Sequence, residues 1–182
     1  MQIGSLVIKK TIQMLICFVS FWSCGTDEND QAGTPSIQEG PSSGTPQSLV
    51  NPNEWRLHTS EDLCNERPFR KELGGIELDT SVCSPITLVQ PSQIDVPMGA
   101  QIRIVAWHSQ LASADGVPAT GQLSIGANGT MIWSVIRPIP SSATIFEEEV
   151  EIIEPINMGD PITLNVRNHG ANQWTLLHLE RL

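Results

Sequence analysis

From about residue 53 to residue 182 the sequence consists of short apolar runs separated by turn residues, without any long stretch of helical periodicity. The runs are rich in Ile, Val, Leu, Thr and Trp, and Gly, Pro and Asn interrupt them repeatedly. Short, evenly spaced runs of this composition are typical of strands in a sandwich or barrel. The pattern predicts an all-β antiparallel sandwich with strands near residues 54–58, 75–80, 86–89, 101–108, 121–126, 130–136, 145–153, 161–168 and 173–180.

Turn residues and alternation refine this prediction. Asn128-Gly129 lies between two apolar runs and favours the positive φ angles of a type I′ turn, so a hairpin is expected there. Residues 97–99 and 158–161 each contain a Met-Gly pair and predict turns that precede strands. A helical turn is allowed within residues 61–73. Alternation places one face of a strand toward the core at Ile102, Ile104 and Ala106, and the other face outward at Arg103, Val105 and Trp107.

The chain divides into three segments. Residues 53–182 form one body of 130 residues, which is large enough for a single core. Residues 24–52 are rich in Gly, Ser, Thr, Pro, Asn, Asp and Gln, so they cannot bury enough apolar surface to offset the entropy of ordering. This segment is expected to be a disordered tether, which by coil scaling holds the domain roughly 30 Å from its start.

Residues 1–23 have the form of an export signal. Lys9 and Lys10 precede a mostly apolar stretch over residues 11–22, and Phe21-Trp22-Ser23-Cys24 stands at the expected cleavage position. The apolar stretch is shorter than the roughly 20 residues that a membrane-spanning helix needs. Ser23-Cys24 resembles the lipobox of bacterial lipoproteins, in which the cysteine is acylated and becomes the new N-terminus, although Phe21 and Trp22 depart from the usual residues.

That resemblance implies a membrane anchor through a lipid on Cys24. In lipoproteins of diderm bacteria an Asp after the cysteine favours inner-membrane retention, and Gly25 occupies that position here. The resemblance therefore implies an outer-membrane lipoprotein of the cell envelope. The alternative is ordinary signal cleavage, which would release a soluble periplasmic or secreted protein.

Charge excludes one class of partner. The chain has 10 basic and 20 acidic residues, a formal net charge of −10, and removal of Lys9 and Lys10 would make it more acidic. Because nucleic acids are bound largely through Lys and Arg, nucleic acid is not expected as a partner.

The cysteines are sorted by export. Cys17 lies in the signal and Cys24 at the cleavage site, which leaves Cys64 and Cys83 as the pair in the mature body. In an oxidising compartment such an isolated pair predicts a disulfide. A metal site is the alternative, but neither cysteine has a CxxC or HxxxH neighbour.

Two further patterns bear on chemistry. The acidic run over residues 147–154 has the composition of an edge strand protected by charge, with Ca²⁺ binding as the alternative. The four histidines are scattered, and no hydrolase, phosphate-loop or zinc motif occurs. No cofactor or metal is therefore expected, and the protein is predicted not to be an enzyme.

The loop before the last strand is the candidate binding region. Asn168, His169 and Asn172 lie beside Trp174, and this combination offers hydrogen-bonding groups and a flat ring to a sugar. Trp107 and His108 would supply a second such pair. The alternative is that the tryptophans are core residues and that the loop is ordinary turn chemistry.

Residues 97–104, 121–126, 159–166 and 168–177 together resemble the strand order of galactose-binding-like jelly rolls. The resemblance implies a jelly-roll sandwich and does not by itself imply a ligand. The leading hypothesis is a non-enzymatic binding or adhesion module of the cell envelope whose ligand is a carbohydrate. The alternatives are a structural subunit that binds another envelope protein and, third, a hydrolase, which would need His108 or His169 beside a nucleophile and a carboxylate.

Overall fold

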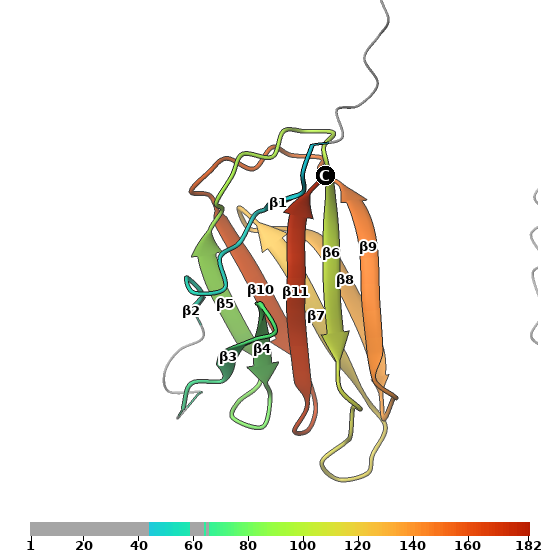
Figure 1. Cartoon of the computed structure of the whole chain (residues 1–182). Coiled ribbons are helices and arrows are strands. Elements are labelled where there is room, and N and C mark those ends of the chain that lie inside the picture. Colours follow the sequence, from blue (N-terminus) through green and yellow to red (C-terminus); the bar gives the residue numbers. More distant parts are fainter. Residues whose placement is uncertain (1–43, 59–63, 65) are drawn as a thin grey trace, which may run out of the picture. The chain divides into compact units, whose positions relative to one another are not determined.

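The computed structural model describes residues 44–58, 64 and 66–182, which fold into two antiparallel sheets (Figure 1). The predicted signal, Cys24 and most of the predicted tether lie outside these residues. Sheet A has the order β3 (Phe69–Glu72), β4 (Gly75–Asp79), β11 (Gln173–Arg181), β6 (Gln101–His108) and β9 (Thr144–Glu151), with β1 (Gln47–Ser48) also paired to β11. Sheet B has the order β2 (Arg56–Leu57), β5 (Ile86–Pro91), β10 (Pro161–Arg167), β7 (Ala119–Ala127) and β8 (Thr130–Ile139).

The strand order makes the sandwich a jelly roll. From β4 onward the eight strands alternate between the sheets at every connection except the β7–β8 hairpin. The result is one sheet of β4, β11, β6 and β9 facing another of β5, β10, β7 and β8. This confirms the predicted all-β antiparallel sandwich and its jelly-roll topology.

The core lies between the sheets and is built by alternation. The predicted inward residues of β6, Ile102, Ile104 and Ala106, are fully buried, as are Ile162, Leu164 and Val166 of β10. Because successive side chains of a strand point to opposite faces, the residues between them face away from the core. The described residues thus contain a complete core of their own.

Two predicted local features are confirmed. Asn128 and Gly129 have φ angles of 51° and 81° and close the β7–β8 hairpin. Residues 147–151 belong to β9, which is the edge strand of sheet A, so the acidic run does protect a sheet edge.

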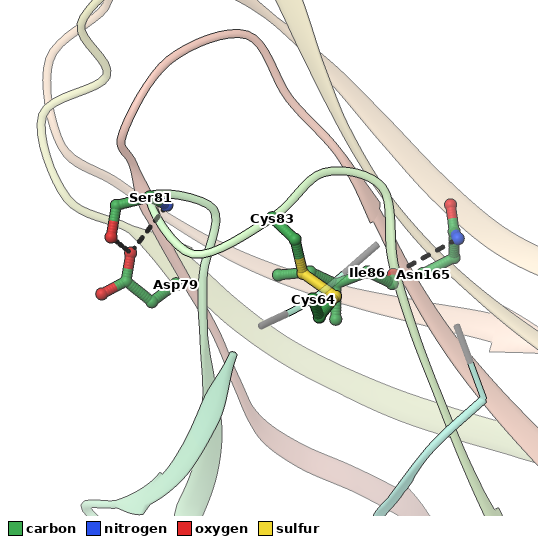
Figure 2. Close-up of a disulfide and its surroundings, with 6 residues drawn as sticks. All are labelled: Cys64, Asp79, Ser81, Cys83, Ile86 and Asn165. Carbon is green, nitrogen blue, oxygen red and sulfur yellow. Dashed lines mark hydrogen bonds between the residues drawn. A yellow bond between two sulfur atoms is a disulfide. The ribbon is translucent and has the colours of Figure 1, made fainter. Parts of the chain in front are cut away.

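The predicted disulfide is also confirmed. Cys64 and Cys83 are bonded, with their Cα atoms 5.2 Å apart (Figure 2). Cys83 lies in the loop between β4 and β5, after a turn in which Asp79 Oδ1 accepts hydrogen bonds from the Ser81 backbone N–H and hydroxyl. The bond therefore ties residue 64 to the loop that carries the chain from sheet A to sheet B.

Two expectations differ from the structure. The folded body begins earlier than residue 53, because β1 pairs with the end of β11 and Leu49 is fully buried beside it. Pairing with β11 satisfies the backbone there, so a polar composition did not prevent order. Within residues 61–73, where a helical turn was allowed, the described residues include β3, paired with β4, while residues 61–63 and 65 lie outside the described part of the chain. Among the described residues there is no helix long and apolar enough to cross a membrane.

Candidate functional site

The outer face of sheet A carries one row of side chains that crosses five strands. The register aligns one residue from each strand, and the inward neighbours Leu78, Leu176 and Ala106 are buried, so the row faces away from the core. We call it the Trp107 row. Its members in spatial order are Arg70 (β3), Glu77 (β4), Thr175 (β11), Trp107 (β6) and Ile145 (β9).

The centre of the Trp107 row is buried although it faces outward. Thr175 is 1% exposed, Glu77 is 3% exposed and Trp107 is half-buried. Thr175 Oγ1 and Trp107 Nε1 are both buried and have no hydrogen-bond partner among the described residues. Buried polar groups are nearly always paired, and these two unpartnered atoms belong to residues that lie opposite each other on β11 and β6.

Charged groups lie on the β3–β4 side of the row. Arg70 Nη2 lies 2.7 Å from Glu77 Oε1, and Arg70 Nε donates to Glu72 Oε2 at 3.0 Å. Burial and the nearby Glu72 carboxylate raise the pKa of Glu77, while Arg70 opposes them. The pair of carboxyl groups around one guanidinium therefore offers both hydrogen-bond acceptors and donors.

A second charged cluster lies further along the same face. Arg103 Nη2 donates to Glu180 Oε2 at 2.7 Å, and Arg103 Nη1 lies 3.7 Å from Glu147 Oε1. His178 Nδ1 lies 3.1 Å from Glu180 Oε1. Val105, between Arg103 and Trp107 on the same side of β6, continues the apolar strip of Trp107 and Ile145. The face thus presents an apolar strip flanked by two clusters of hydrogen-bonding groups.

The predicted binding loop is built differently. Trp174 is fully buried, and its ring centroid lies 4.8 Å from that of His108, which is also fully buried. Trp174 Nε1 donates to Asn168 Oδ1 at 3.2 Å, and His108 Nδ1 lies 2.7 Å from the Ser109 carbonyl oxygen. Both rings therefore belong to the core, and the expectation that they face a ligand is corrected.

The amides of the loop have structural partners. Asn172 is 2% exposed; its Oδ1 accepts from the Ala112 N–H at 2.7 Å and its Nδ2 donates to the Ala112 carbonyl at 3.0 Å. Asn168 Nδ2 donates to Thr80 Oγ1 at 2.9 Å and to the Gly170 carbonyl at 2.8 Å. These side chains hold neighbouring loops together, which is why Asn172 is also withdrawn as a ligand-facing residue.

His169 is the exposed member of the predicted set. Its Nε2 lies 3.4 Å from Asp115 Oδ1, and both side chains are about half exposed. Hydrogen bonds from the Val117 N–H and the Ser113 hydroxyl are the main causes that lower the pKa of Asp115 to about 2. His169 and Asn168 border a shallow surface hollow with Ser84, Thr120 and Arg167, and no Trp or Phe side chain lines it.

The structure thus separates the two predicted pairs. Trp107 lies on the outer face of sheet A, whereas His108, its neighbour in β6, points into the core. Sequence reasoning identified the outward face of β6 but did not predict that Glu77 and Thr175 share a row with Trp107. Their position follows from the pairing of β4, β11 and β6, and the sequence of any one of these strands does not indicate that pairing. Among the described residues no group of three or more His, Cys, Asp or Glu side chains is placed to hold a metal ion.

No family model matches the sequence, and no curated protein matches it. Solved structures that resemble the fold include the following three. The N-terminal cellulose-binding domain of Cellulomonas fimi β-1,4-glucanase C is 12% identical over 76% of this chain and 94% of that one, with a TM-score of 0.48. A CBM4 domain is 13% identical over 72% and 89%, with a TM-score of 0.44. TmCBM61, in complex with β-1,4-galactotriose, is 11% identical over 75% and 98%, with a TM-score of 0.40.

Proposed function

We propose that the protein is a non-enzymatic binding module whose ligand is a carbohydrate, bound on the outer face of sheet A at the Trp107 row. The observation that carries the proposal is that Trp107 Nε1 and Thr175 Oγ1, on residues opposite each other in β6 and β11, are buried and have no hydrogen-bond partner within the described part of the chain. An indole N–H is a donor and a hydroxyl is both donor and acceptor, so sugar hydroxyls match both.

The rest of the face fits the same ligand class. A pyranose has an apolar face that packs on an indole, and its equatorial hydroxyls bond with carboxylates and guanidinium groups. The strip of Trp107, Val105 and Ile145, with Ile145 70% exposed, supplies the apolar surface. Arg70 with Glu77 and Arg103 with Glu180 supply polar groups on its flanks. Because Thr175 Oγ1 and Trp107 Nε1 are both covered, a ligand reaches either atom only when neighbouring side chains move.

Glycan-array binding of the purified domain tests the proposal. Trp107→Ala should weaken binding by at least about tenfold, because it removes both the packing surface and the donor. Thr175→Val should weaken binding while preserving shape, which guards against an effect of misfolding. His169→Ala is the control. His169 lies in the loop before β11 and is not part of the Trp107 row, so this variant should bind as the parent does. Unchanged binding by both Trp107→Ala and Thr175→Val would remove this site.

The cellular setting is also a proposal. We infer from the sequence that Cys24 is acylated and anchors the domain to the outer membrane of the cell envelope. Intact-mass measurement of the membrane fraction should show a chain that begins at an acylated Cys24. A soluble product that begins elsewhere would leave export in place and withdraw the anchor.

A further inference from the structure

Exposed apolar side chains gather at one end of the sandwich. Nine large apolar side chains are exposed in the described residues, and five of them lie at this end, each 45–71% exposed. They come from the β5–β6 loop, the start of β8, the β9–β10 loop and the C-terminus (Figure 1). We call this end the methionine pole, and its five exposed residues are Met98, Met131, Ile153, Met158 and Leu182.

Two paired turns form the middle of the methionine pole. Val96 bridges to Ile156, both are buried, and each is followed two residues later by an exposed methionine, Met98 or Met158. A glycine at positive φ follows each methionine, with values of 83° at Gly99 and 94° at position 159. The Met158 N–H donates to Asp95 Oδ1 at 2.7 Å and joins the two turns. The buried residues Val96 and Ile156 therefore fix the two turns, and the methionines that follow them are exposed.

The apolar surface continues to the β7–β8 hairpin. Asn128 Nδ2 donates to Asp160 Oδ2 at 2.8 Å, which connects the hairpin tip to the second methionine turn. Beside it, a hollow of about 240 Å³ is lined by Met131, Ile153 and Pro155 among others. The hollow therefore brings Met131 and Ile153 together beside the hairpin, and the Asn128–Asp160 bond joins that hairpin to the second methionine turn.

The charge of the methionine pole indicates which kind of surface could bind it. Residues 92–100 and 152–160 contain Asp95, Glu154 and Asp160 and have no Lys or Arg, and beside them lies one basic side chain, Arg181, whose Nη1 donates to the Asp95 carbonyl at 2.7 Å. Hydrogen bonds from Asn128 and Asn157 lower the pKa of Asp160, so its charge is retained at neutral pH. An anionic surface would be repelled by these carboxylates, whereas a zwitterionic surface would not.

The course of the chain shows at which end of the sandwich the segment after Cys24 joins the fold. The described chain begins at Gly44, and β1 pairs Gln47 with Arg181 at the end of β11, so the chain enters at the methionine pole. Leu182, the other end of the chain, donates its N–H to the Gln101 carbonyl at the same pole. Gly44 follows Cys24 by twenty residues. This end is therefore the one at which the chain arrives from the proposed lipid anchor.

We propose that the methionine pole docks on the surface of a zwitterionic lipid bilayer, inserting Met98, Met158 and Ile153 at the headgroup boundary. Flexible methionine side chains adapt to irregular apolar surfaces, and loop residues of this kind add apolar contact to a lipid anchor. The argument rests on the proposed anchor only for the nearness of a membrane. Docking would stand the strands upright on the bilayer and leave the Trp107 row facing sideways.

Vesicle flotation tests the pole without the anchor. The protein is the chain from residue 24 onward with Cys24→Ser, which retains the whole described core, and the probe is a phosphatidylcholine vesicle. The parent should float with the vesicles, and the double variant Met98→Ser with Met158→Ser should partition about tenfold less, since two exposed apolar groups are lost. Ile136→Ser is the matched control, because Ile136 is 62% exposed on β8 away from the pole, and it should float as the parent does.

A second arm replaces part of the phosphatidylcholine with phosphatidylglycerol, which should weaken flotation because the pole is acidic. The docking proposal is overturned if the parent does not float, if the double variant floats equally well, or if anionic lipid strengthens binding. Crosslinking of the pole to an envelope protein without vesicle binding would likewise overturn it in favour of a protein partner. Glycan binding measured on the same preparations distinguishes failure of the pole from failure of the Trp107 row.

Discussion

The loop of residues 168–174 and the Trp107 row contain similar side chains, yet their polar atoms are in opposite states. In the loop, the indole of Trp174 donates to Asn168, and the amides of Asn168 and Asn172 bond to neighbouring loops. In the row, the indole of Trp107 and the hydroxyl of Thr175 are buried and find no partner in the part of the chain that the structure describes. Tryptophan beside amides or hydroxyls thus describes both a structural network and a candidate binding surface.

The difference teaches that pairing, rather than residue type, separates the two roles. A fully bonded polar group contributes to stability, whereas a buried group without a partner is destabilising until something binds it. Substitutions in the loop should therefore lower stability. Substitutions in the row should affect binding more than stability, and one of them should raise stability.

The largest effect is expected for Trp174→Ala. Trp174 is fully buried, and its truncation leaves a cavity and an unpaired Asn168 oxygen, so the free energy of unfolding should fall by about 3–5 kcal/mol. Trp107→Ala, at a half-buried position, should lower it by only about 1–2 kcal/mol. Urea denaturation measures both, and equal losses for the two tryptophans would contradict the comparison.

Asn172→Ala is expected to follow. The substitution removes hydrogen bonds to the Ala112 N–H and carbonyl and leaves these partly buried backbone groups unpaired, so stability should fall by about 2–3 kcal/mol. His169→Ala in the same loop should change stability by no more than about 0.5 kcal/mol, because its side chain is half exposed. A loss at His169 as large as that at Asn172 would show that the loop is not held by its amides.

Acid should lower the free energy of unfolding through His108, the buried end of β6 that packs against Trp174. Burial is the main cause that lowers the pKa of His108, and the charge of Arg137 lowers it further, while the hydrogen bond with Ser109 opposes them. The unfolded chain therefore takes up the proton first as pH falls below about 6.5. Stability should be complete above that pH and should decline below it, by about 1.4 kcal/mol for each unit by which the pKa is lowered.

The measurement is the free energy of unfolding of the parent and of His108→Leu, from about pH 7.5 down through the range below about pH 6.5 in which the decline is expected. The variant should lack the decline that belongs to this side chain. Parallel pH profiles for the parent and the variant would show that the imidazole does not contribute.

The smallest effect is expected at Thr175, and its sign is the sharpest test. Thr175→Val replaces a buried, unpartnered hydroxyl with a methyl group of similar shape, so stability should rise by about 0.5–1 kcal/mol. Thr80→Val is the matched change at a bonded hydroxyl, because Thr80 Oγ1 donates to loop carbonyls and accepts from the Asn172 N–H. That variant should lose stability, and a loss in both variants would mean that Thr175 is bonded in solution.

Much of the fold was accessible from the sequence, because strand period and turn chemistry are local. The inward residues of β6 and the Asn128-Gly129 hairpin needed only neighbouring residues to be identified. β1 was missed because a two-residue strand in a polar segment has no period, and its order comes from pairing with β11 at the far end of the chain.

The candidate site was accessible only in part, because burial of its residues depends on distant partners. Trp174 packs where Gly121 leaves room: a Cβ at that glycine would lie 2.8 Å from the indole. Nothing near Trp174 in the sequence indicates that space. Glu77 presents the opposite case, since a charged strand residue is normally solvated but here lies between Arg70 and Thr175.

The entry of the chain into the sandwich has a mechanical consequence. Any pull delivered through Gly44 reaches the fold at Gln47 and Ser48, which pair antiparallel with the final strand, and then at Leu49, whose N–H donates to the Leu179 carbonyl and whose carbonyl accepts from the Gln93 N–H. The pairing of β1 with β11 and the buried side chain of Leu49 would therefore be the first contacts to resist that pull. Extension under force should begin by detaching β1, and the jelly roll behind it should yield only at higher force.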